Sequence, residues 1–490
     1  MLRELAALRE EASRLCARLA GLHAADVLGK PIPATLREVL REHRLSTSSD
    51  GLAQAREALQ NAQAQDPRLP ARIARLTALV NFLVQARALA LEPGAAQELF
   101  ELPRRKLVKP PGDAGLHGAL PPVLVERQLP FERDREKRAE LEAAYAEALG
   151  QFDGVRGAVF EARETALREA GIVPARSPLP EQVLEGTDAI AQDLGGWLLE
   201  RNTGAKNGFA RHDVLHLVHA PRCASAFPRG ELVRTVRRWA EMFRFDLLAG
   251  KAIRLDDDDT PQKRAGAFAL PVDAPYETVV SLLPQEGPRA LGALLFALGE
   301  AQRFAGPSSD APPEDVWLGD PAVRIACGAL FEGLVRDREF LRRCAKVELP
   351  RDDERAIAMA SVFELRSCAA RAIATFEARD LGPGARTAHL HRDLFARATL
   401  AELPVGLALE GVDAFPTALD ELRGRMLAAG MRAFLRERYD EDFWRNPRAL
   451  GALQSVWARG GRPTEEEIWA ECSLPAGFGP LRMELLDTCQ

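Results

Sequence analysis

The 490-residue sequence has few residues of the kinds that build the commonest catalytic motifs. It contains eight histidines, seven cysteines and three tyrosines. The cysteines are odd in number and show no C-x-x-C spacing, which argues against a disulfide framework and favours free thiols in a reducing compartment. The sequence also has no G-x-S-x-G nucleophile elbow, no P-loop and no G-x-G-x-x-G after a strand. It therefore gives no support to the common hydrolase, nucleotide-triphosphatase and dinucleotide-binding classes.

The charge and hydropathy of the chain argue against two kinds of partner. Charged residues make up 28% of the sequence and the net charge is −6, so no overall basic field attracts nucleic acid. No stretch of 18 uninterrupted apolar residues occurs, so no membrane-spanning helix is predicted. The first ten residues place acids within an amphipathic helical pattern, unlike the apolar stretch of a signal peptide. We therefore expect a cytoplasmic protein without a nucleic-acid or membrane partner.

Helical periodicity dominates the sequence. Apolar positions recur at helical spacing, with Arg and Glu between them, over residues 2–22, 33–43, 52–64 and 71–91. Residues 134–170 continue this pattern as one long helix or as a broken pair. A chain of 490 residues exceeds one ordinary hydrophobic core. The sequence therefore predicts a mainly α-helical protein with two helical lobes.

Two short segments depart from the helical pattern. Residues 265–272 and 278–283 look like strands, and the breaker Pro-Gln-Glu-Gly at 284–287 follows them. A helix rich in Leu, Ala and Phe comes next. We expect the two strands to form a small antiparallel sheet beside that helix.

This helix contains the frame of a zinc-binding motif without its reactive residues. In H-E-x-x-H, one helical turn presents two histidines to the metal, and the Glu activates the metal-bound water. Here the frame reads Phe296-Ala297-Leu298-Gly299-Glu300, with Phe for the first His, Ala for the Glu and Glu for the second His. A helix of this composition is by default a core helix, so its surroundings decide how the frame is interpreted.

Those surroundings make the chain resemble the thimet oligopeptidase and oligoendopeptidase F family of zinc peptidases. Bacterial members have a zinc helix similar to H-E-A-G-H-A-Q-H-F-A. Five residues of this chain match that pattern outside the reactive positions: Gly299, Ala301, Gln302, Phe304 and Ala305. Residues 438–448, R-Y-D-E-D-F-W-R-N-P-R, are similar to the family's R-Y-G-x-D-W-W-R-N-P segment. The resemblance covers residues 205–490.

The other functional positions of the family are also substituted. The family takes its third zinc ligand, a Glu, from a second helix, and its spacing from Glu300 reaches Ile325. Glu332 belongs to the same apolar block but lies two helical turns further on. Residues 413–420 lie where the family has tyrosines that stabilise the tetrahedral intermediate, and none of the three tyrosines of this chain is there.

The resemblance implies a zincin-like fold in which two helical lobes surround a channel. It divides the chain into three regions. Residues 1–130 are expected to form an N-terminal helical region, residues 131–204 a helical connecting lobe, and residues 205–490 a degenerate metallopeptidase-like domain.

The same resemblance implies that the catalytic site has been lost. The degenerate positions are Phe296, Ala297, Glu300 and Ile325, so no zinc or other cofactor is expected. Apolar replacements can fill the space of a lost metal site, whereas buried Glu300 needs a partner, for which Arg324 or Arg303 is a candidate. The first hypothesis is therefore a pseudoenzyme that binds a peptide or protein partner in the vestigial channel.

Two alternatives from other classes stay open. His212, His216 and His219 lie on one helical face, and His212 and His216 have the spacing of zinc ligands, with Asp213 in the place of a catalytic Glu. An active metal-dependent peptidase or other hydrolase could use this relocated pair, although it needs a third ligand from elsewhere. The other alternative is a structural scaffold protein that forms a homodimer through its N-terminal helices.

Overall fold

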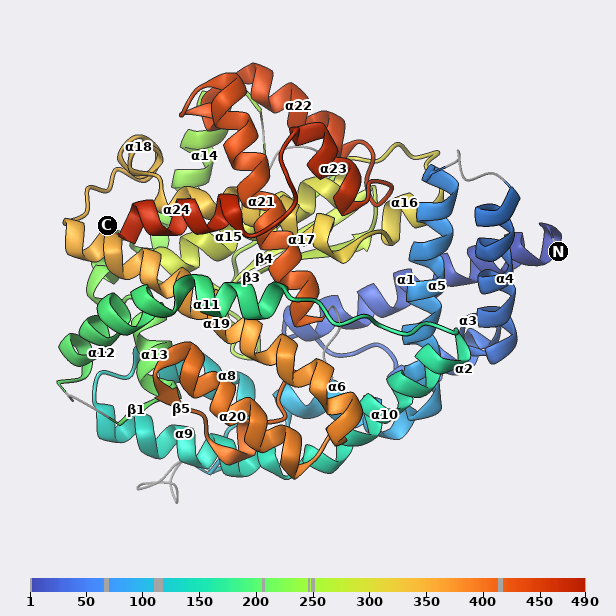
Figure 1. Cartoon of the computed structure of the whole chain (residues 1–490), viewed down its shortest axis with the longest axis horizontal. Helices are drawn as coiled ribbons and strands as arrows, with labels where there is room; N and C mark the ends of the chain where they lie inside the picture. Colours follow the sequence, from blue (N-terminus) through green and yellow to red (C-terminus); the bar gives the residue numbers. More distant parts are fainter. Residues whose placement is uncertain are drawn as a thin grey trace.

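The computed structural model describes residues 2–489 except 66–69, 110–117, 205–207, 246, 248–251 and 413–416. In these ranges the protein is mainly α-helical and has a small three-stranded sheet and a short parallel pair, β1 (Phe209–Ala210) with β5 (Ala401–Glu402) (Figure 1). The N-terminal helices are α1 (Leu2–Val27), α2 (Leu36–Glu42), α3 (Arg44–Thr47), α4 (Ser49–Gln65), α5 (Pro70–Leu91) and α6 (Pro93–Glu101). The four helices predicted from periodicity in this region are therefore confirmed.

Helix α5 is long and apolar enough to cross a membrane by length and composition alone, with a mean hydropathy of 1.3. It is the one such helix among the described residues. In the structure it packs against α4 and against α10 (Asp153–Glu169). Its residues Arg75 and Arg87 form ion pairs with Asp315 and Glu169. These contacts are those of a core helix of the N-terminal region.

The helices after residue 121 build the rest of the molecule. The predicted segment 134–170 is a broken pair, α9 (Arg135–Gly150) and α10, with the break at Gln151 and Phe152. The remaining long helices are α11 (Leu179–Ile190), α13 (Arg211–Val218), α14 (Leu232–Phe243), α15 (Pro288–Ala305), α17 (Pro321–Glu332), α19 (Arg351–Leu381), α20 (Ala385–Thr399), α21 (Ala418–Tyr439), α22 (Pro447–Trp457), α23 (Glu465–Cys472) and α24 (Gly479–Cys489). One hydrophobic cluster runs through this part of the chain, from Leu102 to Cys489.

The N-terminal helices have smaller hydrophobic clusters of their own. One of them joins α1, α4 and α5 to Ala166 and Ala170 at the end of α10, and another joins α1, α2, α5 and α6. Figure 1 shows α4 and α5 side by side at the N-terminal edge of the molecule, with α1 running across them. The boundaries at residues 130 and 204 stay predictions.

The sheet lies against α15. Strands β3 (Ala267–Asp273) and β4 (Glu277–Leu282) pair antiparallel, with Ala267 opposite Leu282, which confirms the predicted strand pair. A third strand, β2 (Ile253–Asp256), pairs parallel with the other edge of β4. The sheet is therefore mixed rather than wholly antiparallel. Both β3 and β4 contact α15, so the sheet positions the helix that carries the degenerate motif.

Candidate functional site

The degenerate motif lies where α15 and α17 approach each other most closely. A Cβ on Gly299 would overlap the carbonyl oxygen of Cys327 and would lie 2.9 Å from the Cα of Gly328. The absence of a side chain at Gly299 therefore lets the two helices meet backbone to backbone. On the same interface, a Cβ on Gly328 would lie 2.9 Å from the ring of Phe296. The aromatic ring thus occupies the space beside Gly328.

The position of the third ligand is packed in the same way. Ile325 is 5% exposed, and a Cβ on Gly424 of α21 would lie 2.6 Å from its Cβ. Ala297 has no exposed surface. Helix α17 therefore packs closely against α15 at Phe296 and against α21 at Ile325.

Glu300 is the polar member of this group and has a specific partner. It is 7% exposed, and its Oε1 accepts a hydrogen bond of 2.6 Å from Nη1 of Arg324 on α17. Burial raises the pKa of Glu300, while Arg324 and Arg303 oppose this shift. Arg303 is used elsewhere, because it donates to the carbonyls of Val316 and Leu318. Of the two candidates from the sequence, Arg324 is the hydrogen-bonded partner.

These side chains do not fit a zinc ion. Phe296, Ala297 and Ile325 offer no donor atom, and the carboxylate of Glu300 is in an ion pair. Zinc in proteins is held by Cys, His, Asp and Glu, usually three or four together. Within the described ranges, no group of three such side chains is arranged to hold a metal ion.

Asp213 lies at the position that a general base would take in the relocated site. It forms ion pairs with two arginines. It is 1% exposed and accepts from Arg135 at 2.9 Å, from Arg138 at 3.3 Å and from the Ala210 N–H at 3.1 Å. Burial alone would raise the pKa of Asp213, but the neighbouring His212 ring and the hydrogen bonds from Arg135 and the Ala210 N–H outweigh burial and hold it well below its usual range. A carboxylate in this state is a poor proton acceptor.

His216 in α13 and His219 directly after it each bond to a different backbone carbonyl. Nδ1 of His216 bonds to the carbonyl of Pro130 at 2.8 Å, and Nδ1 of His219 bonds to the carbonyl of Leu215 at 2.8 Å. Burial lowers the pKa of His219 to about 3, with Arg289 adding to the shift. No third ligand joins His212 and His216 from the described part of the chain.

The other residues that the sequence matched to segments of the family form contacts within the fold. Residues 413–416 lie outside the described residues. Asp420 accepts from the N–H and hydroxyl of Thr417, which forms the capping box that starts α21. Glu332 accepts from Arg425 at 2.6 Å. Trp444 of the 438–448 segment has no exposed surface, and its carbonyl accepts from the indole N–H of Trp239.

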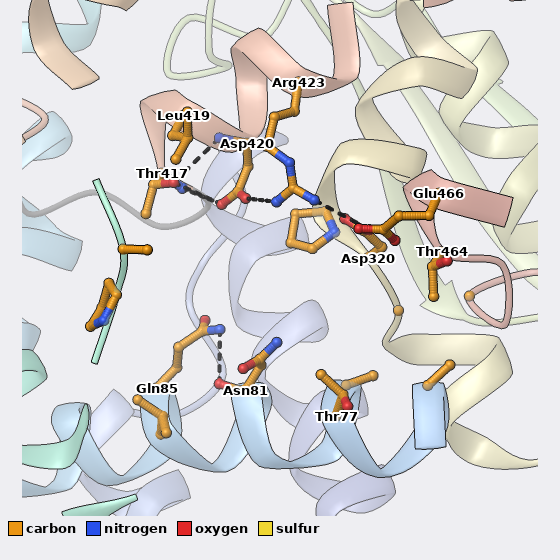
Figure 2. A pocket seen from close by; sticks show the side chains of 18 of the residues that line it. Thr77, Asn81, Gln85, Asp320, Thr417, Leu419, Asp420, Arg423, Thr464 and Glu466 are labelled. Atoms are coloured by element: carbon orange, nitrogen blue, oxygen red, sulfur yellow. Dashed lines mark hydrogen bonds and ion pairs between the residues drawn. The ribbon is translucent and has the colours of Figure 1, made fainter. Parts of the chain in front are cut away.

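A cavity of about 680 Å³ lies between the N-terminal helices and the rest of the molecule. One wall is α5, and the opposite wall consists of the starts of α17, α21 and α23 (Figure 2). Helices α10 and α19 complete the lining. Pro321 lines this cavity one helical turn before Ile325, whereas none of the four degenerate positions lines it. Ligand pockets commonly have volumes of about 300–1,000 Å³, so the cavity has the size of a binding site.

Of the residues that line this cavity, only 417–420 belong to a segment that the sequence had indicated as a functional position of the family. Thr77, Asn81 and Gln85 on α5 are spaced four residues apart, so the sequence shows a stripe of uncharged polar residues on a helix that is apolar apart from its arginines. Nothing in the sequence showed which distant segments face that stripe. Figure 2 shows these three side chains opposite Thr417, Asp420, Asp320 and Glu466.

Comparison with known proteins identifies solved structures that share this architecture. No protein-family model and no curated protein matches the sequence. A solved structure assigned as an oligoendopeptidase F superposes with a TM-score of 0.65 at 12% identity, covering 100% of this chain and 96% of that one. A carboxypeptidase from Pyrococcus furiosus gives 0.57 at 12% identity, covering 99% of each chain. Metallocarboxypeptidase 1 of Trypanosoma cruzi gives 0.58 at 12% identity, covering 100% of each chain.

The chain has the oligoendopeptidase-like peptidase fold. At 12% identity the likeness establishes the fold alone, so the chemistry must be judged from the residues of this chain. The predicted fold class is confirmed, including the small sheet beside α15.

Proposed function

We propose that the protein is a catalytically inactive member of this structural group and binds a peptide, or an extended segment of a protein, in the cavity beside α5. The main observation in support of this proposal is the Glu300–Arg324 ion pair. It is formed within an otherwise apolar interface between α15 and α17, at the position of the second histidine in the H-E-x-x-H frame. The four substitutions form a compatible packed set, which favours a stable replacement of the metal site.

The proposed binding site is the cavity beside α5, which none of the four substituted positions lines. The cavity has a volume of about 680 Å³ and lies between α5 on one side and the starts of α17, α21 and α23 on the other. Its lining combines apolar side chains such as Ile73, Val84 and Phe376 with polar ones. A mixed lining of this kind suits a peptide, whose backbone is polar and whose side chains vary.

The relocated metal site has less support. Asp213 is in ion pairs with two arginines, and Nδ1 of His216 is hydrogen-bonded to Pro130. A hydrolase using His212 and His216 would therefore have to break these contacts and to recruit further ligands.

The test is a metal and turnover measurement on the purified protein. Zinc would be measured by elemental analysis after exposure to excess zinc and removal of unbound metal, and a mixed peptide library would be analysed for cleavage by mass spectrometry. The proposal expects far less than one equivalent of zinc and no cleavage. Stoichiometric zinc that disappears in the His212→Ala/His216→Ala variant, together with cleavage of the library, would instead establish the relocated enzyme.

A further inference from the structure

The cavity beside α5 has one uncharged polar wall, made of Thr77, Asn81 and Gln85, which we call the amide face. All three residues line the cavity. Gln85 donates to the backbone carbonyl of Asn81 at 3.2 Å, which leaves its side-chain oxygen as an acceptor. No described residue forms a hydrogen bond with the side chain of Thr77 or Asn81. These groups are therefore available to an occupant of the cavity.

The spacing of the amide face matches an extended peptide. Residues four apart on a helix are separated by about 6 Å along its axis. Two residues of an extended chain span about 6.6 Å, so successive side chains of the amide face can reach every second peptide group. An amide both donates and accepts, as a peptide group does. Binding through these groups would not depend on the sequence of the peptide.

The opposite wall has an excess of negative charge. Arg423 bridges three carboxylates, with distances of 2.5 Å to Glu465, 3.4 Å to Asp420 and 3.8 Å to Asp320. Glu466 and Glu467 add two further carboxylates, and Arg462 adds one further guanidinium. Four of these carboxylates line the cavity beside the two guanidinium groups of Arg423 and Arg462, whereas Glu465 pairs with Arg423 outside the lining. We call the four lining carboxylates the acidic wall: Asp320, Asp420, Glu466 and Glu467.

The helix starts at this wall do not favour an anion. Some of the first N–H groups there are used within the protein, because Asp320 accepts from the Ala322 N–H and Thr417 accepts from the Asp420 N–H. At the far end of the cavity, Arg163 and Arg379 both lie within ion-pair distance of Glu164. The acidic wall is therefore the part of the lining with the largest unbalanced charge.

We propose that the cavity binds an extended peptide segment carrying a lysine or arginine, with its backbone on the amide face and its cationic side chain against the acidic wall. This inference rests on the proposed function and specifies which peptides the cavity would prefer. The amide face contributes affinity for any peptide, whereas the acidic wall selects cationic side chains.

The test uses short fluorescein-labelled peptides that are amidated at the C-terminus and differ at one central residue, which is lysine, norleucine or glutamate. Fluorescence polarisation with the full-length protein measures their affinities. We expect the lysine peptide to bind about five- to tenfold more tightly than the glutamate peptide, with norleucine between them. The preference should decrease at high salt, because the acidic wall is partly solvated.

Two variants separate the two walls. Asn81→Ala should weaken all three peptides by a similar factor, about three- to tenfold. Glu466→Gln should reduce the lysine preference by about threefold and leave the norleucine peptide unchanged. The matched controls are Gln454→Ala and Glu437→Gln, which change exposed helical residues outside the cavity lining.

The outcomes distinguish the inference from the function on which it rests. If no peptide binds, both are wrong. If peptides bind with equal affinity whatever the central residue, or if Asn81→Ala behaves like Gln454→Ala, peptide binding stands and the inference is overturned. Mass spectrometry of the recovered peptides reports cleavage separately, so hydrolysis would overturn the inactive assignment without affecting the charge preference.

Discussion

Arg324 of α17 donates to Glu300 of α15 at 2.6 Å, across the interface at which the sequence frame of a zinc peptidase would place its ligands. The pair differs from a buried salt bridge in one respect. The side chain of Arg324 is 29% exposed, whereas that of Glu300 is 10% exposed. Water can therefore compensate part of the loss when the pair is broken.

Glu300→Leu should lower the free energy of unfolding by about 1–3 kcal/mol, because it leaves Arg324 without its carboxylate. The double variant Glu300→Leu/Arg324→Leu should recover most of that loss, since both charges are then removed. Urea unfolding of the three proteins measures both values. A single variant as stable as the parent protein, or more stable, would mean that the ion pair is not required.

Gly299→Ala should be strongly destabilising, by about 3 kcal/mol or more, because the added Cβ would overlap the Cys327 carbonyl of α17. Gly292→Ala is the matched control on the same helix, where the nearest atom to an added Cβ is 3.5 Å away. We expect this control to be neutral or to gain up to about 1 kcal/mol from better helix propensity. Equal stability of the two variants in thermal unfolding would contradict the close approach of α15 and α17.

Glu484 should make the stability of the protein depend on pH in the acid range. Burial alone would raise its pKa, but Arg432 and Arg336 outweigh burial and lower the pKa to about 2. A depressed carboxyl pKa contributes stability that is fully present above the unfolded value, near 4.5, and is lost as the pH falls through the folded value. Glu484→Gln should therefore lower the free energy of unfolding by about 2–3 kcal/mol at neutral pH. The difference in stability between the variant and the parent protein should become smaller as the pH falls from 4.5 to about 2.

Chemical unfolding of Glu484→Gln and the parent protein across this pH range checks the prediction. Glu441→Gln is the control, since the side chain of Glu441 is 91% exposed and its variant should track the parent protein at every pH. A constant difference between Glu484→Gln and the parent protein down to pH 2 would be incompatible with a depressed pKa.

Two ion pairs join the N-terminal helices to α16 (Pro313–Trp317). Arg9 of α1 donates to Glu314 at 2.7 Å, and Arg75 of α5 donates to Asp315 at 2.7 Å. Glu314 and Asp315 are 2% and 6% exposed. The variant Glu314→Gln/Asp315→Asn should speed hydrogen exchange in α1, α5 and α16 and leave α19 and α21 unchanged, because only the first group loses contacts.

Hydrogen exchange followed by mass spectrometry measures the exchange rate of each of these helices separately. Asp310→Asn, at an exposed residue before α16, should leave the exchange pattern as it is in the parent protein. If the double variant shows no faster exchange in α1 and α5, these ion pairs do not hold the N-terminal helices in place.

Local patterns were sufficient for much of the fold. The periods of α1, α4 and α5 were visible because each helix buries one face, and the strand pair β3–β4 was visible because apolar runs end at turn residues. The likeness of the 296–300 frame to a zinc motif was also local. It was informative because Gly299 must stay small where α17 passes.

The sequence by itself thus determined the helical class and the strand pair, since each depends on residues close together in the chain. The tertiary structure alone decided that Arg324 rather than Arg303 pairs with Glu300, that β2 adds a parallel strand, and that Asp213 is held by two arginines. It also decided that Asn81 faces the acidic wall across the cavity. These contacts join residues far apart in the chain, and their geometry arises only when helices pack.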